Sequence, residues 1–292
     1  MRAPRLGQVL GFSTLNGATE PAWPDRQNED FYLASSEVVV LIDGAGTPPG
    51  SETGCTHGVA WFARRLGGAV FAAAHSPDLN LVESLRTAIA DVAAVHADTC
   101  DLAHPGTPSA TVTMVRVRDA ELEYLALADS VLVLERDSGV EAITDARIAE
   151  LERRYRPDVD ATAFGSPEQA EAIRTYNRRL RAHRNQPGGF WVASSRADAA
   201  DQAVTGAVPL PDLRTVSLLS DGASRLVDTF GVVDWAGLVR VLRSRGPAAL
   251  IADVREQERA DPDGRQFPRG KIHDDATAVL GTVQTGLVRP VR

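Results

Sequence analysis

Hydrophobic runs along this chain repeatedly end in an acidic residue. The clearest run spans residues 38–44, where five aliphatic residues precede Asp43 and Gly44. An uninterrupted run of this kind predicts a strand that is covered on both faces, and the glycine allows a turn directly after it. The same order recurs at residues 215–222, which lead to Asp221 and a glycine. Each predicted strand therefore delivers a carboxylate to its own end.

Two acidic pairs also lie at predicted strand boundaries. Glu29 and Asp30 precede a short strand-like segment, and Asp274 and Asp275 open the apolar run 276–280. Any one of these acids could belong to a simple turn, because Asp before Gly is a common turn dipeptide. Four such sites together favour a metal centre, since clustered carboxylates repel one another unless cations neutralise them. Hard oxygen ligands select Mg²⁺ or Mn²⁺.

Helical spacing of apolar residues flanks these strands. The pattern predicts core-facing helices at about 53–75 and 81–99, the second with a capping box formed by Asn80 and Glu83. Further helices are expected at about 235–245 and 248–259, separated by Gly and Pro.

Three β-rich runs follow the second predicted helix, at 110–117, 121–128 and 131–135. The turns between them are so short that consecutive runs cannot be parallel, which predicts an antiparallel meander and argues against a purely doubly wound α/β fold. Near the start of the chain, residues 8–13 alternate in polarity and predict an edge strand.

Residues 144–205 are more polar and predict a flap-like insertion, with helical pieces at about 145–154 and 167–184. Five arginines gather in its second half. The simpler interpretation is a solvated helix face, and the alternative is a docking surface for an acidic or phosphorylated partner. These arginines are Arg174, Arg178, Arg179, Arg181 and Arg184.

Composition narrows the functional classes. At 292 residues and 43% hydrophobic content, the chain can form one large globular domain or two small ones. The formal charge of -8 argues against nucleic acid as a partner. No run approaches the roughly 20 apolar residues that span a bilayer, so no membrane contact and a cytoplasmic location are expected.

Cys55 and Cys100 show no metal-ligand spacing and are too few for a disulfide framework, so each is expected to be a small, partly buried side chain.

Five short motifs in a fixed order resemble the metal-dependent protein phosphatases of the 2C type, including the bacterial serine/threonine phosphatases. The similarity covers roughly the whole chain and is weakest across residues 140–210. The motifs are Asn28-Glu29-Asp30, Asp43-Gly44-x-Gly46, Ser109-Ala110-Thr111 with Ala128-Asp129-Ser130, Ser220-Asp221-Gly222, and Asp274-Asp275-Ala276-Thr277.

The resemblance implies an α+β fold, a four-layer αββα sandwich in which two antiparallel sheets are flanked by helices. It implies a single domain over residues 1–292, with the insertion at about 144–205, and a binuclear metal site at one edge. The expected cofactors are two Mn²⁺ or Mg²⁺ ions, with a third at a weaker site.

Carried over residue by residue, the resemblance gives Asp43 the role of bridging both metals, while Gly44 contributes its carbonyl oxygen. Glu29 would serve mainly one metal. Asp221 and Asp274 would serve the other, and Asp30 would lie in the surrounding shell. The remaining acid, Asp129, matches the residue that joins Asp221 at the third site in bacterial members.

The activity implied by the resemblance is hydrolysis of phosphoserine or phosphothreonine in proteins. A hydroxide that bridges the two ions would attack the phosphorus in line, and an arginine would hold the phosphate oxygens. The expected partner is a phosphoprotein substrate, and the expected state is a monomer.

Two positions depart from the family pattern. The arginine that usually lies four residues before Glu29 is replaced by Asp25, which leaves Arg26, one place later, as the candidate phosphate ligand. Ala45 replaces the histidine that serves eukaryotic members as a general acid, so His57 and His273 are weighed as substitutes. A phosphatase-like regulatory module that binds a phosphoprotein with little or no turnover is the alternative function. A hydrolase for a small phosphoester is a third.

Overall fold

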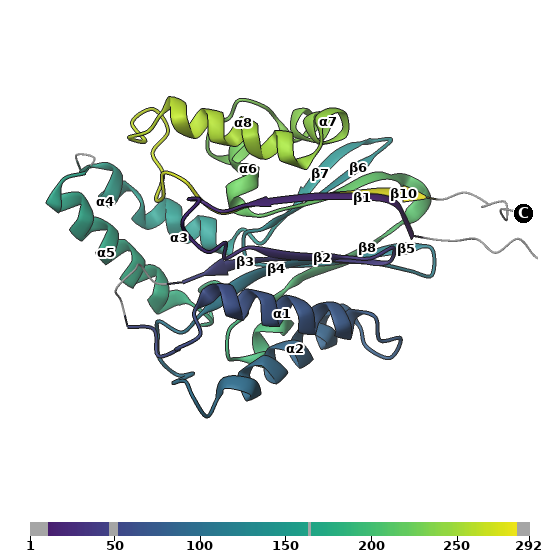
Figure 1. Ribbon diagram of the computed structural model, residues 1–292, viewed down its shortest axis with the longest axis horizontal. Coiled ribbons are helices and arrows are strands. Elements are labelled where there is room, and N and C mark those ends of the chain that lie inside the picture. Colours follow the sequence, from purple (N-terminus) through teal and green to yellow (C-terminus); the bar gives the residue numbers. More distant parts are fainter. Residues whose placement is uncertain (1–10, 47–51, 163–164, 285–292) are drawn as a thin grey trace, which may run out of the picture.

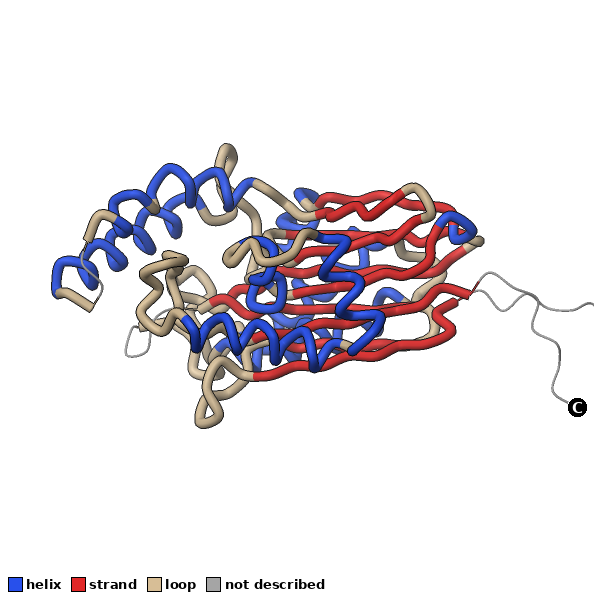
Figure 2. The backbone as a smooth tube through the Cα atoms, turned by 90° about the horizontal axis from the view of Figure 1, so that it is seen from above, coloured by secondary structure: helices blue, strands red, loops and turns tan. Residues whose placement is uncertain are grey.

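The computed structural model describes residues 11–46, 52–162 and 165–284. Two five-stranded antiparallel sheets lie face to face, and helices cover the outer face of each sheet (Figure 1). The view from above shows the strands of the sandwich running along its length (Figure 2). The predicted αββα sandwich is thus confirmed.

The first sheet has the strand order β1-β10-β9-β6-β7. Its strands are β1 (Gly11–Glu20), β10 (Ala276–Gln284), β9 (Leu213–Leu219), β6 (Val131–Arg136) and β7 (Gly139–Ile143). The edge strand that the sequence placed at 8–13 is β1, which continues to Glu20; residues 8–10 lie outside the described residues.

The second sheet has the order β2-β3-β4-β5-β8. Its strands are β2 (Phe31–Ala34), β3 (Val38–Ala45), β4 (Ser109–Arg118), β5 (Glu121–Leu127) and β8 (Val204–Pro209). Successive side chains of a strand point to opposite faces. Accordingly Val40 and Ile42 pack toward the helices, whereas Val39 and Leu41 pack between the sheets. This explains why the run at 38–42 is apolar at every position.

Helices α1 (Val59–Ala74) and α2 (Leu81–His96) cover the sheet that contains β3. The predicted capping box of Asn80 and Glu83 is present at the start of α2. On the other side, the sheet that contains β9 is covered by α6 (Asp221–Asp228), α7 (Trp235–Arg245) and α8 (Pro247–Ala260). Among the described residues, no helix combines the length and apolar character needed to cross a membrane.

Helix α1 begins later than the apolar spacing predicts. Gly58 has φ of 81°, a left-handed conformation that cannot continue a helix, so the helix begins at Val59 rather than near residue 53. His57, which the sequence placed on this helix, therefore lies in the loop before it.

The predicted meander is half correct. Strands β4 and β5 pair antiparallel, but β6 lies in the other sheet, where it pairs with β7 and β9. The tight turn at residues 128–130 therefore crosses between the sheets, and Ala128 adopts φ of 68° within it. Turn length alone could not distinguish a hairpin from a crossing. The crossing is what brings Asp129 to the end of the sandwich.

Between β7 and β8 the chain forms α3 (Arg147–Tyr155), α4 (Pro157–Asp160) and α5 (Pro167–His183), which extend beyond one end of the sandwich in both views (Figures 1 and 2). Two short 3₁₀ helices, at Ala197–Gln202 and Leu210–Asp212, precede and follow β8. The arginines of this segment do not act as one surface. Arg174 pairs with Glu171 on the exposed face, whereas Arg184 donates hydrogen bonds to the carbonyl oxygens of Pro105 and Thr107.

Candidate metal centre

Strand register brings the predicted acids to one end of the sandwich. Phe31 pairs with Ile42, so the acidic pair before β2 lies beside the end of β3. In the other sheet Leu219 pairs with both Val131 and Ala278, so the acids near the end of β9 and the starts of β6 and β10 lie together. We call Glu29, Asp30, Asp43, Asp129, Asp221 and Asp274 the carboxylate centre. Positions far apart in the sequence therefore meet because strand ends meet.

Asp43 lies at the middle of the carboxylate centre. Its Oδ2 is 3.4 Å from the backbone nitrogen of Asp221, which starts α6 on the opposite sheet. Loss of hydration raises the pKa of Asp43 well above its ordinary value, and the negative charge of Asp221 raises it further. The two sheets thus present their acids to each other across a short gap.

Asp30 is buried, at 6% exposure, and its Oδ2 has no hydrogen-bond partner among the described residues. Burial raises its pKa to about 8, and the nearby charges of Asp275 and Asp221 contribute to the shift. A buried carboxylate oxygen with no partner is costly. A cation at this position would satisfy it.

Asp129 occupies the crossing between β5 and β6. Loss of hydration raises its pKa to about 7, and the charges of Asp221 and Glu152 add to the shift. Glu152 belongs to α3, so the projecting helices also bring a carboxylate toward this end of the sandwich.

Asp274 contacts two cationic side chains. Its Oδ1 accepts a hydrogen bond from Lys271 Nζ at 2.7 Å, and its Oδ2 accepts one from Arg225 Nη2 at 3.2 Å. Partial desolvation lowers the pKa of the Lys271 amine, but the charges of Asp274 and Asp221 outweigh it and raise that pKa above its usual value. The only lysine of the sequence therefore contributes a cation to the carboxylate centre.

A buried ionic network supports the segment that carries Asp274. Glu258 on α8 is fully buried and accepts hydrogen bonds from Arg225 Nη1 at 2.5 Å and Arg255 Nη1 at 2.8 Å. Arg255 also donates to the backbone oxygen of Asp274 at 2.7 Å, and His273 Nδ1 lies 2.6 Å from Glu258 Oε2. The sequence analysis missed this network. Its only signal was charged residues on a helix that packs against the core.

Asp275 connects the loops at this end of the sandwich. Its carboxylate accepts the backbone N–H of Ala22 at 2.7 Å and that of Glu29 at 2.6 Å. Burial raises the pKa of Glu29, whereas the positive charge of Lys271 opposes that shift. Of the acidic pair, Asp274 thus faces the carboxylate centre while Asp275 fixes the position of Glu29.

Gly44 is required by the close approach of two segments. A Cβ at this position would lie 2.6 Å from the carbonyl oxygen of Glu29 and 2.6 Å from Cγ1 of Val59. Any other residue would push β3 away from the loop that carries Glu29 or from the start of α1.

The donor set fits hard divalent cations. It consists of carboxylate oxygens at strand ends. One buried oxygen has no partner among the described residues, and several carboxylate pKa values are raised by burial and then by mutual repulsion. Mg²⁺ and Mn²⁺ prefer such ligands. Glu29, Asp43, Asp221 and Asp274, with the backbone of Gly44, are the residues that could hold them.

Comparison with known families agrees with this geometry. A family model described as protein phosphatase 2C matches residues 26–254, which is most of the chain. The chain belongs to the protein phosphatase 2C family. No curated protein sequence matches the chain.

Solved structures of protein phosphatase 2C relatives share the fold. The phosphatase MsPP from Mycobacterium smegmatis, solved with cacodylate, is 18% identical with a TM-score of 0.55, and covers 94% of this chain and 100% of its own. Stp1 from Staphylococcus aureus is 14% identical with a TM-score of 0.56, and covers 97% of this chain and 99% of its own. The catalytic domain of PstP, solved with two manganese ions, is 17% identical with a TM-score of 0.55, and covers 94% of this chain and 99% of its own.

The departures from the 2C pattern can now be located. Arg26 lies exposed in the turn before Glu29, and its charge opposes the burial-driven rise in the pKa of Glu29. Neither of the two candidate histidines, His57 and His273, directs its Nδ1 atom toward the carboxylate centre. The Nδ1 atom of His273 contacts Glu258, and the Nδ1 atom of His57 lies 3.3 Å from Cys100 Sγ.

Proposed function

We propose that this chain is a Mn²⁺- or Mg²⁺-dependent protein phosphatase that hydrolyses phosphoserine and phosphothreonine. One observation supports the proposal most: six acids from five separate segments converge at one end of the sandwich, with Asp43 and the backbone of Asp221 joining the two sheets. Family membership and the manganese ions of the PstP structure add to it.

In this proposal Asp43 would hold both cations, and Gly44 would offer its carbonyl oxygen. Glu29 would hold mainly one cation, while Asp221 and Asp274 would hold the other. Asp129 and Asp221 would hold a third, weaker cation, and Asp30 would support the set from its buried place near Asp43. When bound, two divalent cations activate water and stabilise the oxygens of an in-line displacement at phosphorus.

The protein's own side chains then have separate tasks. Arg26, exposed beside Glu29, binds the phosphate oxygens of the substrate. The Glu258 network keeps Asp274 in place, because Arg225 contacts both carboxylates. Since Ala45 offers no proton and the Nδ1 atoms of the two candidate histidines face elsewhere, we propose that solvent protonates the departing alcohol.

A phosphoprotein substrate is proposed over a small phosphoester because Asp221 of the carboxylate centre is exposed and helices project beyond this end of the sandwich. Helices α3–α5 extend past this end, and Glu152 of α3 raises the pKa of Asp129. A polypeptide can reach such a position while contacting the projecting helices. We propose that the chain acts as a monomeric single domain, with α3–α5 as its flap.

A second candidate function rests on Lys271. Its ammonium group already lies against Asp274, and a resident cation competes with divalent ions for the same carboxylates. A regulatory module that binds phosphoproteins with little turnover is consistent with that competition and with the displaced Arg26.

Hydrolysis of a phosphothreonine peptide separates the two functions. We expect wild-type protein to release phosphate in proportion to added Mn²⁺ or Mg²⁺, and Asp221→Asn to lose that activity. Asp137→Asn, an exposed acid paired with Arg214, is the matched control and should retain it. A folded, metal-binding wild type with no turnover at any metal concentration would support the regulatory module instead. Parallel reactions with phosphorylated metabolites test the third possibility.

A further inference from the structure

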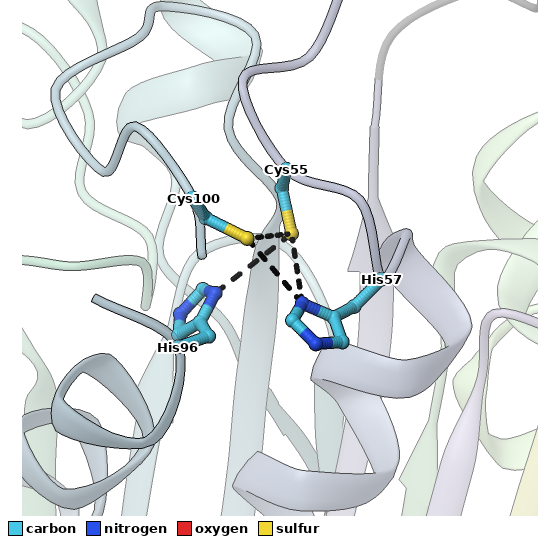
Figure 3. Close-up of side chains that lie close together, drawn as sticks. All are labelled: Cys55, His57, His96 and Cys100. Atoms are coloured by element: carbon cyan, nitrogen blue, oxygen red, sulfur yellow. Dashed lines mark hydrogen bonds between the residues drawn. The ribbon is translucent and has the colours of Figure 1, made fainter. Parts of the chain in front are cut away.

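Two cysteines and two histidines from two separate segments, one before α1 and one at the end of α2, lie close together (Figure 3). Cys55 and His57 belong to the loop before α1, whereas His96 ends α2 and Cys100 follows four residues later. One ligand atom from each residue lies within 4.8 Å of those of the other three. Within the described residues, no other set of three or more potential metal ligands is so compact. We call these four residues the Cys/His cluster.

Four of the six distances between ligand atoms of the Cys/His cluster fit a tetrahedral zinc site. Cys100 Sγ lies 3.4 Å from Cys55 Sγ and 3.3 Å from His57 Nδ1. Cys55 Sγ lies 3.8 Å from His57 Nδ1 and 3.8 Å from His96 Nδ1. Zinc bonds of about 2.3 Å to sulfur and about 2.0–2.1 Å to nitrogen place neighbouring tetrahedral ligands about 3.3–3.8 Å apart. The side chains are therefore already spaced as the corners of a zinc site.

Surrounding contacts hold these ligands in place. The hydroxyl of Thr53 donates to the carbonyl of Cys55 at 2.8 Å, and the N–H of Asp101 donates to the carbonyl of Gly54 at 2.8 Å, which joins the two loops. The ring of Trp61 stacks on His57 with centroids 4.2 Å apart and lies 5.2 Å from the buried ring of His96. The cluster is thus supported by packing as well as by hydrogen bonds.

We propose that Cys55, His57, His96 and Cys100 form a structural Zn²⁺ site. Two thiolates and two imidazoles are a donor set that selects zinc over the hard ions of the carboxylate centre. Four protein ligands complete a tetrahedron and leave no open position for substrate, which is the mark of a structural site. The sequence analysis considered the spacing between Cys55 and Cys100 alone. The signal that it missed is that His57 lies two residues after Cys55 and His96 four residues before Cys100, although the two pairs meet only after folding.

The zinc site would fix the start of α1. His57 is separated from Val59 by one glycine, and Val59 packs against Gly44 and Gly46, whose added Cβ atoms would lie 2.6 Å and 2.5 Å from its methyl groups. The ion would therefore anchor α1 at the point where the helix contacts the turn after β3.

The competing possibility is a disulfide between the two cysteines. Their sulfurs are 3.4 Å apart, well beyond the roughly 2.0 Å of an S–S bond, and both thiols are free. An external oxidant would have to remove two electrons and two protons to form that bond. Metal binding requires none, because the thiols only lose their protons to solvent.

Zinc content tests the proposal. Protein purified with reductant and without chelator should carry one zinc per chain, measured by elemental analysis after gel filtration. His75→Ala, a histidine at the other end of α1, is the control and should keep the zinc. Cys55→Ser and Cys100→Ser should lose it, with affinity reduced beyond the roughly 10–100-fold cost of losing an outer-shell partner.

Cobalt substitution in the wild type keeps the test valid if a cysteine variant does not fold. Co²⁺ should give thiolate-to-cobalt charge-transfer absorption and the intense visible bands of a tetrahedral site, and Asp43→Asn should not change them. The proposal is overturned if reduced wild type binds no stoichiometric zinc and shows no such absorption. It is also overturned if both cysteine variants retain zinc, or if the protein is isolated with a Cys55–Cys100 disulfide and binds no zinc after reduction.

Discussion

The carboxylate centre takes Asp43 from the end of β3, whereas the Cys/His cluster takes Cys55 and His57 from the loop before α1, and the two groups of side chains differ in charge. The Cys/His cluster consists of groups that can be neutral, and its ligand atoms lie within 4.8 Å of one another. The carboxylate centre consists of like charges, whose repulsion and loss of hydration raise several pKa values. The neutral Cys/His groups can therefore lie close together at little electrostatic cost, whereas the carboxylate centre carries repulsion that a cation would relieve.

The largest expected effect concerns the ionic network beneath the carboxylate centre. Glu258→Gln removes the charge that Arg225 and Arg255 share, and leaving buried charges uncompensated costs about 3–5 kcal/mol of unfolding free energy. We expect this variant to unfold at a lower urea concentration and to bind Mn²⁺ more weakly than wild type. The zinc content of the folded variant should be unchanged.

The surface acid Glu141, paired with Arg136, is the control for that variant. Glu141→Gln should change stability by no more than about 1 kcal/mol. Equal stability of Glu258→Gln and wild type would show that the network does not support Asp274.

Gly44 contacts both the loop that carries Glu29 and Val59 at the start of α1. In Gly44→Ala the new methyl group would overlap the backbone of Glu29 and the side chain of Val59, so we expect a loss of about 1–3 kcal/mol and a raised Mn²⁺ requirement. Gly68→Ala, in α1 with open space at its Cβ, should instead be neutral or stabilising by about 0.5–1 kcal/mol. Thermal unfolding and Mn²⁺ titration of both variants would measure the difference, and identical behaviour would contradict the close approach.

Changing the pH separates the effect of the carboxylate centre from the rest of the fold. Asp30 and Asp129 have pKa values raised to about 8 and about 7, so the folded protein without divalent ions holds these protons more tightly than the unfolded chain. Their contribution to stability is present at low pH and is lost as pH rises toward about 8.

Added Mn²⁺ should therefore raise the unfolding temperature more at about pH 8 than at about pH 5.5, where protons compete for the ligands. Differential scanning calorimetry at the two pH values measures this. An equal Mn²⁺ effect at both would argue against a repelling cluster.

The smallest expected effect belongs to Lys271. Its ammonium group contacts Asp274 and lies close enough to Asp221 for their charges to interact, so it competes with a divalent cation. Lys271→Met should lower the Mn²⁺ concentration needed for half-maximal turnover by up to about tenfold, equivalent to about 1.4 kcal/mol. Lys271→Arg keeps the charge and should change it little. A higher Mn²⁺ requirement in Lys271→Met would mean that the lysine supports the site.

The strands and the acids at their ends could be predicted from the sequence for one physical reason. Buried strands are continuous apolar runs, and the acids directly follow or precede those runs, so their position at strand ends is visible in residues 38–44 and 215–222. Once the motifs indicated the 2C family, the facing sheets placed those ends together.

The features that escaped prediction all depend on contacts between distant segments. The turn at Ala128 gives no sign of whether it forms a hairpin or crosses between sheets. Glu258 and Arg255 resemble ordinary residues of an amphipathic helix until α8 packs against the segment before β10. Cys55 and His96 are 41 positions apart, and only the packing of α1 against α2 brings them together.

The central claim is that divalent ions held at Asp43 drive hydrolysis of a phosphorylated protein. Mn²⁺ binding by calorimetry and phosphothreonine-peptide turnover should be measured on the same samples of wild type, Asp43→Asn and Asp137→Asn. We predict that wild type and Asp137→Asn bind at least two ions and turn over as the ions bind, whereas Asp43→Asn remains folded and loses both properties. Near-wild-type turnover by Asp43→Asn at modest Mn²⁺, or full Mn²⁺ binding by wild type without turnover, would contradict the account.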